Sequence, residues 1–333
     1  PRPRPPPPPT DGVARVAVCD DPLSQAAGSE WAKYWADLEL MEEIQKDVVR
    51  THPDIHFFSG TEEDEQVRYQ AMEKILFCYA KLNPGVRYVQ GMNELVGTLF
   101  YVFATDGDNA WRAHAEADTF FCFSALMAEM QDVFIRNLDD SESGIRGRIL
   151  RISELLGEHD PQLLQHLEDH QLDPSFFALR WITTLLSREF NLADTIRLWD
   201  ALFADTQGQD LLTYICVAML VLQREDLLRG DFSTNLQILQ AYPPTDVQQL
   251  LDKSSSMRTY DQYTRAMREQ AKAAADGAAA AAAGAVAAAR KTMSQGLSQL
   301  RRTWRASADA YGKAKPFQSF ISESWIFGPD HEG

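Results

Sequence analysis

The stretch SEWAKYWADLELMEEIQKDVVRTHPD, residues 29–54, decides the fold class. Its apolar side chains recur at steps of three and four residues, the period of one face of an α-helix: Trp31, Trp35, Leu38, Met41, Ile44 and Val48. Ser29 is a residue type that caps helix N-termini, and Pro53 is expected to stop the helix. The stretch therefore predicts one long amphipathic helix, with folded structure beginning near Ser29.

The same helical period continues along the chain. In EQVRYQAMEKILFCYAKLNPG it is carried by Tyr69, Met72, Ile75, Leu76, Tyr79 and Leu82, before Pro84 and Gly85 break the helix. Further helices are expected at Glu94–Phe103, Ala110–Ile135, Ile145–His159, Pro161–Glu168, Pro174–Glu189, Leu192–Phe203, Leu211–Leu222, Asp226–Arg229, Ser233–Gln240 and Asp246–Lys253. No alternating apolar and polar stretch bounded by hairpin turns predicts a strand. The expected fold class is all-α.

Composition limits the classes of function. The chain has 333 residues, 45% of them hydrophobic, which is enough for a sizeable core. Its formal net charge of -16 argues against a general nucleic-acid binder and favours a partner of basic or mixed charge. Four scattered cysteines, Cys19, Cys78, Cys122 and Cys216, form no CxxC pair, so we expect buried free thiols in a reducing compartment.

The sequence gives no sign of a membrane span or a signal peptide. The opening PRPRPPPPPTDG predicts an extended, flexible segment over residues 1–28, which could serve as a linker or as a ligand for an SH3-type module. It lacks the apolar core of a signal peptide. No stretch reaches 18 uninterrupted apolar residues, and the poly-Ala run Ala278–Ala289 is short. A cytoplasmic protein is therefore expected, with membrane contact at most peripheral.

Residues 254–333 differ in character from the rest. Within Thr264–Lys315, ten Lys or Arg stand against three acidic residues, a net charge of +7 in an Ala-rich stretch that favours helix. Three interpretations stay open: a helix packed on the acidic domain, a flexible basic tail, or an anchor for an anionic membrane surface. The final FQSFISESWIFGPD is aromatic enough to dock on the body.

Few residues by themselves predict catalysis. The seven histidines are dispersed, and we expect no metal site among them. The phosphate-binding GxxxxGKS loop and the GxSxG nucleophile elbow are both absent, which argues against nucleotide binding by this chain alone and against serine-hydrolase chemistry. The carboxylates Glu42, Glu43 and Asp47 fit a solvated helix face.

Two short motifs stand out. In IQKDVVR, residues 44–50, Asp47 is placed to hold the guanidinium of Arg50. Arg50 lies where the helix ends, and its side chain can either project into a partner or simply favour the helix C-terminus. In YVQGMN, residues 88–93, Gly91 eases the backbone after Gln90 and Asn93 is expected to cap the helix that begins at Glu94. Taken alone, this stretch fits a capping loop.

Together these motifs resemble a known family. IxxDxxR followed by YxQGMN resembles the two signature motifs of the TBC domain, the GTPase-activating domain for Rab GTPases. FFALRWITTLLSREF, residues 176–190, and TIRLWDALFAD, residues 195–205, resemble two further segments of that family. The resemblance covers residues 29–253. It implies an all-α domain of two helical subdomains. The flexible residues 1–28 and residues 254–333, with the Ala-rich basic segment and the aromatic tail, lie outside the resemblance.

The resemblance also implies a mechanism and a partner. The partner would be a Rab-family small GTPase in its GTP-bound form, in vesicle trafficking, and it would carry the GTP and Mg²⁺, so that this chain needs no cofactor of its own. Arg50 would stabilise charge on the transferred phosphate and Gln90 would orient the attacking water. Asp47, Tyr88, Gly91 and Asn93 would support these two residues or touch the partner.

Some features leave alternatives open. Arg180, Trp181 and Glu189 match the third segment, and we expect them to serve packing and ion pairing. The family's Arg-rich, Trp-containing opening helix with its Gly-Ile-Pro type stretch has no counterpart in residues 1–28. A catalytically inactive module that only binds a GTPase or a scaffold partner is the alternative function, although such a module would not need both Arg50 and Gln90.

Overall fold

The structure, a computed structural model, describes residues 29–59, 62–134, 144–206 and 210–311. Within these ranges every regular element is a helix, which confirms the all-α prediction. The helices are α1 (Glu30–Val48), α2 (Glu62–Leu82), α3 (Met92–Ala104), α4 (Asn109–Arg112), α5 (Ala115–Phe134), α6 (Ile145–His159), α7 (Pro161–Asp169), α8 (Ser175–Thr183), α9 (Leu192–Ala204), α10 (Asp210–Leu222), α11 (Arg224–Arg229), α12 (Phe232–Gln240) and α13 (Val247–Tyr311).

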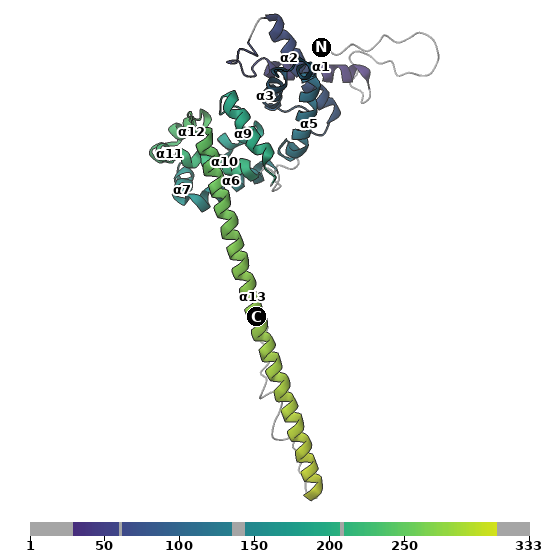
Figure 1. The fold of residues 1–333 in the computed structure, drawn as a ribbon, viewed down its shortest axis with the longest axis vertical. Helices are drawn as coiled ribbons and strands as arrows, with labels where there is room; N and C mark the ends of the chain where they lie inside the picture. The colour runs from purple at the N-terminus through teal and green to yellow at the C-terminus, as the bar shows by residue number, and fades with distance from the viewer. Residues whose placement is uncertain (1–28, 60–61, 135–143, 207–209, 312–333) are drawn as a thin grey trace, which may run out of the picture. The chain divides into compact units, whose positions relative to one another are not determined.

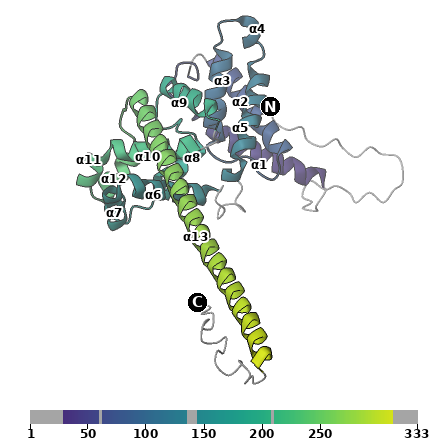
Figure 2. The ribbon, with the colours of Figure 1, turned by 60° about the horizontal axis from the view of Figure 1, so that its bottom comes forward.

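The helices before Tyr260 form two packed groups (Figures 1 and 2). In the N-terminal group, α3 packs on α5, and α2 contacts α1, α3 and α5. In the C-terminal group, α6 contacts α7, α8 and α10, while α11 and α12 pack on α7 and α8. A contact between α5 and α6 joins the groups. This arrangement agrees with the two helical subdomains expected from the family resemblance.

Both groups are held together by fully buried apolar side chains. In the N-terminal group, Ile44 of α1, Met72 of α2 and Leu95 of α3 are inaccessible to solvent. In the C-terminal group, Trp181 of α8 and Ile215 of α10 are equally buried. Burial of apolar surface is the main favourable term in folding. These side chains therefore fix the end of α1, the start of α3 and helix α8 relative to one another.

Helix α1 departs in part from its predicted apolar face. Met41, Ile44 and Val48 are buried as predicted, but Leu40 is buried as well, and Trp35 is half exposed. The helix begins with Ser29 capping the backbone N–H of Ala32 at 3.2 Å, as predicted. It ends at Val48, five positions before Pro53. The C-terminal half of α1 is therefore the part that anchors it in the core.

Two predicted helices are interrupted. The segment predicted as Ala110–Ile135 forms α4 and α5 with a turn between them, and its last predicted residue lies outside the described residues. The segment predicted as Pro174–Glu189 ends at Thr183, because Leu185 and Leu186 adopt positive φ values of 48° and 64°. The Nε1–H of Trp199 donates to the Leu185 carbonyl at 2.9 Å, so a tertiary contact stabilises the break.

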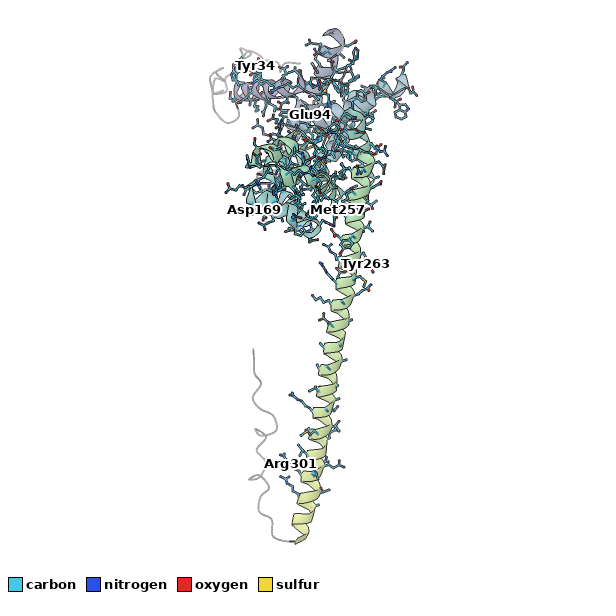
Figure 3. All side chains as sticks on the ribbon, turned by 90° about the vertical axis from the view of Figure 1, so that its left-hand side faces the viewer. Tyr34, Glu94, Asp169, Met257, Tyr263 and Arg301 are labelled. Carbon is cyan, nitrogen blue, oxygen red and sulfur yellow. The ribbon has the colours of Figure 1, made fainter. Side chains whose placement is uncertain are left out.

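Helix α13 spans 65 residues, so the predicted helix end at Lys253 is wrong. The chain divides at Tyr260 into two compact units. In the first unit, α13 buries Leu250 and Met257, and Arg258 pairs with Asp205 at 2.7 Å. In the second unit, the side chains project outward from a long continuous helix, as Figure 3 shows around Arg301. Predictions for residues 1–28 and for the aromatic tail, residues 317–330, lie outside the described residues.

Two other expectations need correction. Only Cys216 is a buried thiol, whereas Cys78 and Cys122 lie on outward faces of α2 and α5 and are exposed; Cys19 lies outside the described residues. His166 and His170 are one helical turn apart, with ring centroids separated by 4.2 Å, so the histidines are less dispersed than expected.

None of the helices described is both long and apolar enough to cross a membrane.

Candidate functional site

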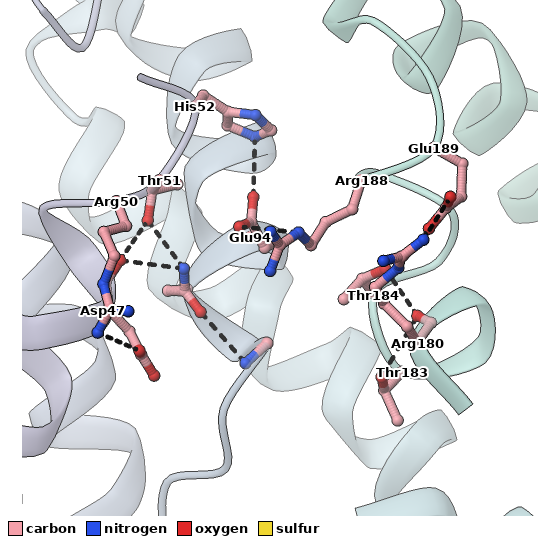
Figure 4. A network of polar contacts seen from close by, with 12 residues as sticks. Asp47, Arg50, Thr51, His52, Glu94, Arg180, Thr183, Thr184, Arg188 and Glu189 are labelled. Carbon is pink, nitrogen blue, oxygen red and sulfur yellow. Dashed lines mark hydrogen bonds and ion pairs between the residues drawn. The ribbon is translucent and has the colours of Figure 1, made fainter. Parts of the chain in front are cut away.

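A polar pocket of about 290 Å³ lies between the two helical groups (Figure 4). Its walls come from the end of α1, from the turn that opens α3, and from α8 with the segment after it. The lining residues are Asp47, Arg50, Gln90, Gly91, Asn93, Glu94, Leu179, Arg180, Thr183, Thr184 and Arg188. The fold thus brings five of the six predicted site residues to one place. The sixth, Tyr88, is buried behind the pocket and donates a hydrogen bond to Asp47.

Arg50 follows α1 in a tight turn, in which its backbone N–H donates to the Asp47 carbonyl at 3.1 Å. Its side chain is 68% exposed. The Nε–H donates to the Lys46 carbonyl at 2.7 Å, and a terminal nitrogen lies 3.6 Å from the Asp47 carboxylate. The base of the guanidinium is therefore held, while its outer N–H groups remain available for a further ligand.

Gln90 lies at the corner of a turn. The N–H of Met92 donates to the carbonyl of Val89 at 3.1 Å, which places Gln90 and Gly91 in the two central positions. Gly91 has φ +104°, a conformation that L side chains rarely adopt, so the predicted backbone role of this glycine is explained. The Gln90 side chain is exposed and lines the pocket.

Asp47 connects the two motifs. Its carboxylate accepts a 2.7 Å hydrogen bond from the hydroxyl of Tyr88 and lies beside Arg50. Tyr88 is buried, so the ring packs beneath the turn. Burial, together with the hydrogen bond to Asp47, raises the pKa of Tyr88, so this hydroxyl stays a donor across the physiological range. Tyr88 of the YVQGMN motif thus holds Asp47 in place, and Asp47 orients Arg50 of its own IQKDVVR motif.

Asn93 does not cap α3, contrary to prediction. The helix begins at Met92 with Gly91 in the cap position, so Asn93 already lies in the first turn. Its side-chain amide donates to Thr51 Oγ1 at 2.9 Å and to the Asp47 carbonyl at 3.3 Å, and its oxygen accepts from the Gly91 N–H at 3.2 Å. Asn93 therefore ties the end of α1 to the turn that carries Gln90.

Glu94 is a buried carboxylate at the floor of the pocket. Burial first, and then the charge of Asp47, raise its pKa to about 6, although the guanidinium of Arg188 opposes the shift. His52 Nε2 lies 3.8 Å from Glu94 and 3.2 Å from Thr98 Oγ1. Burial, followed by the charge of Arg188, lowers the pKa of His52 to about 4. At neutral pH the histidine is therefore uncharged and does not form an ion pair with Glu94.

The opposite wall of the pocket carries two arginines that are held differently. Arg180 makes a two-pronged ion pair with Glu189 at 2.7 and 2.8 Å and also donates to the Gln240 carbonyl at 2.7 Å. Trp181 beside it is fully buried. Arg188 is half exposed and lies 3.9 Å from Glu94, too far for a direct hydrogen bond. Arg180 thus makes the expected ion pair, whereas Arg188 is loosely held.

Sequence reasoning did not single out Glu94, Arg188 or Thr184 as pocket residues. Thr184 and Arg188 lie within residues 176–190, and Glu94 was expected to begin a helix, but no periodic signal marks any of them as a pocket residue. Arg188 follows the positive-φ break at Leu185 and Leu186, so its direction depends on backbone geometry that the apolar pattern does not show. The described residues contain no group of three or more His, Cys, Asp or Glu side chains that could hold a metal ion.

A family model for the Rab-GTPase-TBC domain matches residues 27–228. The chain belongs to this family. Human TBC1 domain family member 13 is 41% identical to it, in an alignment that covers 74% of this chain and 77% of the relative. The fission yeast GTPase-activating protein gyp1 is 30% identical, with coverage of 63% of this chain and 42% of the relative.

A solved structure agrees with this TBC fold. The crystal structure of the Ypt/Rab-GAP domain of Gyp1p superposes with a TM-score of 0.60 at 24% identity, covering 73% of this chain and 77% of that one. At that identity the likeness supports the fold alone. It is consistent with the two packed helical groups that enclose the pocket of the TBC domain described above.

Proposed function

We propose that this TBC protein is a GTPase-activating protein for a Rab-type small GTPase in its GTP-bound form. Family membership and the name of the fission yeast relative support the general activity. The observation that carries the proposal is the joint exposure of Arg50 and Gln90 on one pocket. Asp47 lies beside the Arg50 guanidinium and accepts from Tyr88, and Asn93 ties the turn that carries Gln90 to the end of α1.

The chemistry of the two side chains fits transfer of a phosphoryl group to water. Arginine stays charged at any relevant pH and presents a planar fork of donors to phosphate oxygens, so Arg50 would neutralise charge that builds up in the transition state. A glutamine amide has both a donor and an acceptor, so Gln90 would accept from the attacking water while donating to a phosphoryl oxygen. Both groups would act in trans on nucleotide bound by the GTPase.

The GTPase would also supply the Mg²⁺ that bridges the phosphates. The chain would then need only to dock, to exclude bulk water from the pocket, and to position its two side chains. Such a protein would act in vesicle trafficking, from the cytoplasm or at the surface of an endomembrane.

The test is single-turnover hydrolysis of GTP by a panel of GTP-loaded Rab proteins, with the full chain added in excess. At least one Rab should show strong acceleration. An arginine supplied in trans is worth about 10³–10⁵ in rate, or about 4–7 kcal/mol. Arg50→Ala should therefore lose nearly all of the acceleration, and Gln90→Ala most of it.

Matched controls come from the body of the same chain. Arg229 on α11 is 72% exposed and forms only surface ion pairs, and Gln165 on α7 is exposed. Arg229→Ala and Gln165→Ala should leave the rate unchanged. Acceleration that survives in the Arg50→Ala/Gln90→Ala double variant would contradict the proposed mechanism. Binding to a GTP-loaded Rab without any acceleration would instead support the inactive binding module.

A further inference from the structure

The second unit of the chain carries a charged surface that the proposed function does not use. Helix α13 continues through Ala-rich sequence to Tyr311, and no acidic residue occurs from Gly277 to Ala308. Five exposed basic residues lie in that range, Arg290, Lys291, Arg301, Arg302 and Arg305, and three more, Arg265, Arg268 and Lys272, precede it. On a protein with a net charge of -16, such a concentration of positive charge is a distinct surface.

The helical period arranges these residues in a stripe. At about 100° per residue, the five basic residues from Arg290 to Arg305 fall within an arc of about 120°. The three earlier ones, Arg265, Arg268 and Lys272, also lie within about 40° of the direction of Arg290, but Glu269 and Asp276 share that side of the helix, so the purely basic stripe runs from Arg290 to Arg305. Spacings of eleven residues, from Arg290 to Arg301 and from Lys291 to Arg302, return to nearly the same face because eleven residues make about three turns.

An apolar stripe adjoins the basic one. Val286, Met293, Leu297 and Leu300 fall within an arc of about 60° directly beside the basic arc. Val286, Met293 and Leu300 are at least half exposed. From Val286 to Arg305, the remaining arc carries only Ala, Gly, Gln and Thr. This part of α13 therefore has one apolar edge, one basic flank and one neutral flank.

We propose that the part of α13 from Val286 to Arg305 binds the surface of an anionic membrane, with the apolar stripe at the level of the acyl boundary and the basic stripe among lipid phosphates. Helices with adjoining apolar and Lys/Arg-rich faces lie in the membrane interface in this way. Charge complementarity favours this occupant over a second copy of the chain, because a paired copy of this part of α13 has no acidic residue from Gly277 to Ala308 to set against the basic stripe. It also agrees with the absence of acidic residues, which an anionic surface would repel.

The energetics make the proposal measurable. Each Lys or Arg near an anionic surface strengthens binding by about fivefold at moderate salt. Replacing three of them should therefore weaken binding by about 100-fold. Because the attraction is screened, binding should also fall as ionic strength rises.

The experiment is co-sedimentation of the full chain with vesicles of phosphatidylcholine alone or with 30% phosphatidylserine. We expect binding to the anionic vesicles only, lost in Arg301→Gln/Arg302→Gln/Arg305→Gln and in 0.5 M salt. The matched control, Lys33→Gln/Arg112→Gln/Arg229→Gln, makes the same charge change at exposed positions of the body and should bind as the wild type does. The Met293→Ser/Leu300→Ser variant should bind the anionic vesicles less strongly, and its binding should still fall as the salt concentration rises.

Several outcomes would overturn the proposal. Equal loss in both triple variants would mean that net charge, rather than the stripe, governs adsorption. No binding by the wild type to anionic vesicles would also refute it. Sedimentation equilibrium could show dimers that are lost in the Met293→Ser/Leu300→Ser variant. If the wild type also fails to bind vesicles, the apolar stripe is a surface for self-association instead. Circular dichroism of each variant shows whether its helix content is kept.

Discussion

At the scale of single residues, the site shows how a few buried polar groups hold two exposed ones. Asp47 accepts from Tyr88 and lies beside Arg50, while Asn93 joins the end of α1 to the Gln90 turn. These contacts fix the backbone from which Arg50 and Gln90 project, so the two side chains start from defined positions, which is the advantage of a preorganised site.

Glu94 provides a pH-dependent prediction at this scale. Its pKa is about 6 in the folded chain, mainly because of burial, compared with an ordinary value of 4.5. Between these values the folded state binds a proton that the unfolded state has lost, so the free energy of unfolding contributed by Glu94 falls as pH rises from 4.5 to 6. The full effect is about 2 kcal/mol.

Glu94→Gln removes this dependence, because an amide does not titrate. The unfolding free energy of the variant minus that of the wild type should therefore rise by about 2 kcal/mol from pH 4.5 to pH 7. The difference is needed because His52 also titrates in this range and acts in the opposite direction: its pKa is lowered, so its stability contribution falls as pH drops from 6.5 toward 4. Urea titrations at several pH values measure the difference; a flat line would show that Glu94 titrates normally.

At the scale of elements, the close approach of α3 to the chain after α1 depends on Gly97. A Cβ added there would lie 2.5 Å from Thr51 Cγ2 and 3.3 Å from His52 Cδ2. Gly97→Ala should therefore lower the unfolding free energy by about 1–3 kcal/mol, although alanine favours the helix. Such crowding would also shift Thr51, which Asn93 contacts at 2.9 Å.

A double-mutant cycle tests the stated cause. Thr51→Ser removes the methyl group that the new Cβ would meet but keeps the hydroxyl that Asn93 contacts. Thr51→Ser should therefore cost less stability in the Gly97→Ala background than in the wild type. Additive effects in urea unfolding would place the strain elsewhere.

The elements also show what the sequence could predict. Most helix positions follow from apolar periodicity, because burial of Ile44, Met72 or Leu95 fixes the face of each helix. The breaks were missed where backbone geometry decides: Leu185 and Leu186 are ordinary helix formers held at positive φ, and Leu185 accepts from Trp199, 14 residues away. The positions of Arg50 and Gln90 could be predicted from two motifs. Arg188 and Glu94 could not, since they reach the pocket through tertiary packing.

At the scale of the whole molecule, the chain combines two units with different sources of stability. The first unit, up to Tyr260, is held by a buried core, and Leu250 and Met257 of α13 belong to it. In the second unit, a long stretch of exposed alanines offers α13 little apolar surface to bury. Isolated helices depend on intrinsic propensity and are marginal in water, so the two units should respond separately to mutation and to denaturant.

Gly277 and Gly284 test this separation. A Cβ at either position would meet nothing within 4 Å, and both lie inside α13. Each Gly→Ala change should therefore favour the helix by about 1 kcal/mol. Far-UV circular dichroism should show more helix at 25 °C and a later loss of signal on heating. Near-UV circular dichroism reports the packed aromatic side chains of the first unit and should keep its midpoint, whereas Gly97→Ala should shift that midpoint. If Gly277→Ala/Gly284→Ala moves the near-UV midpoint as well, the two units unfold as one cooperative body.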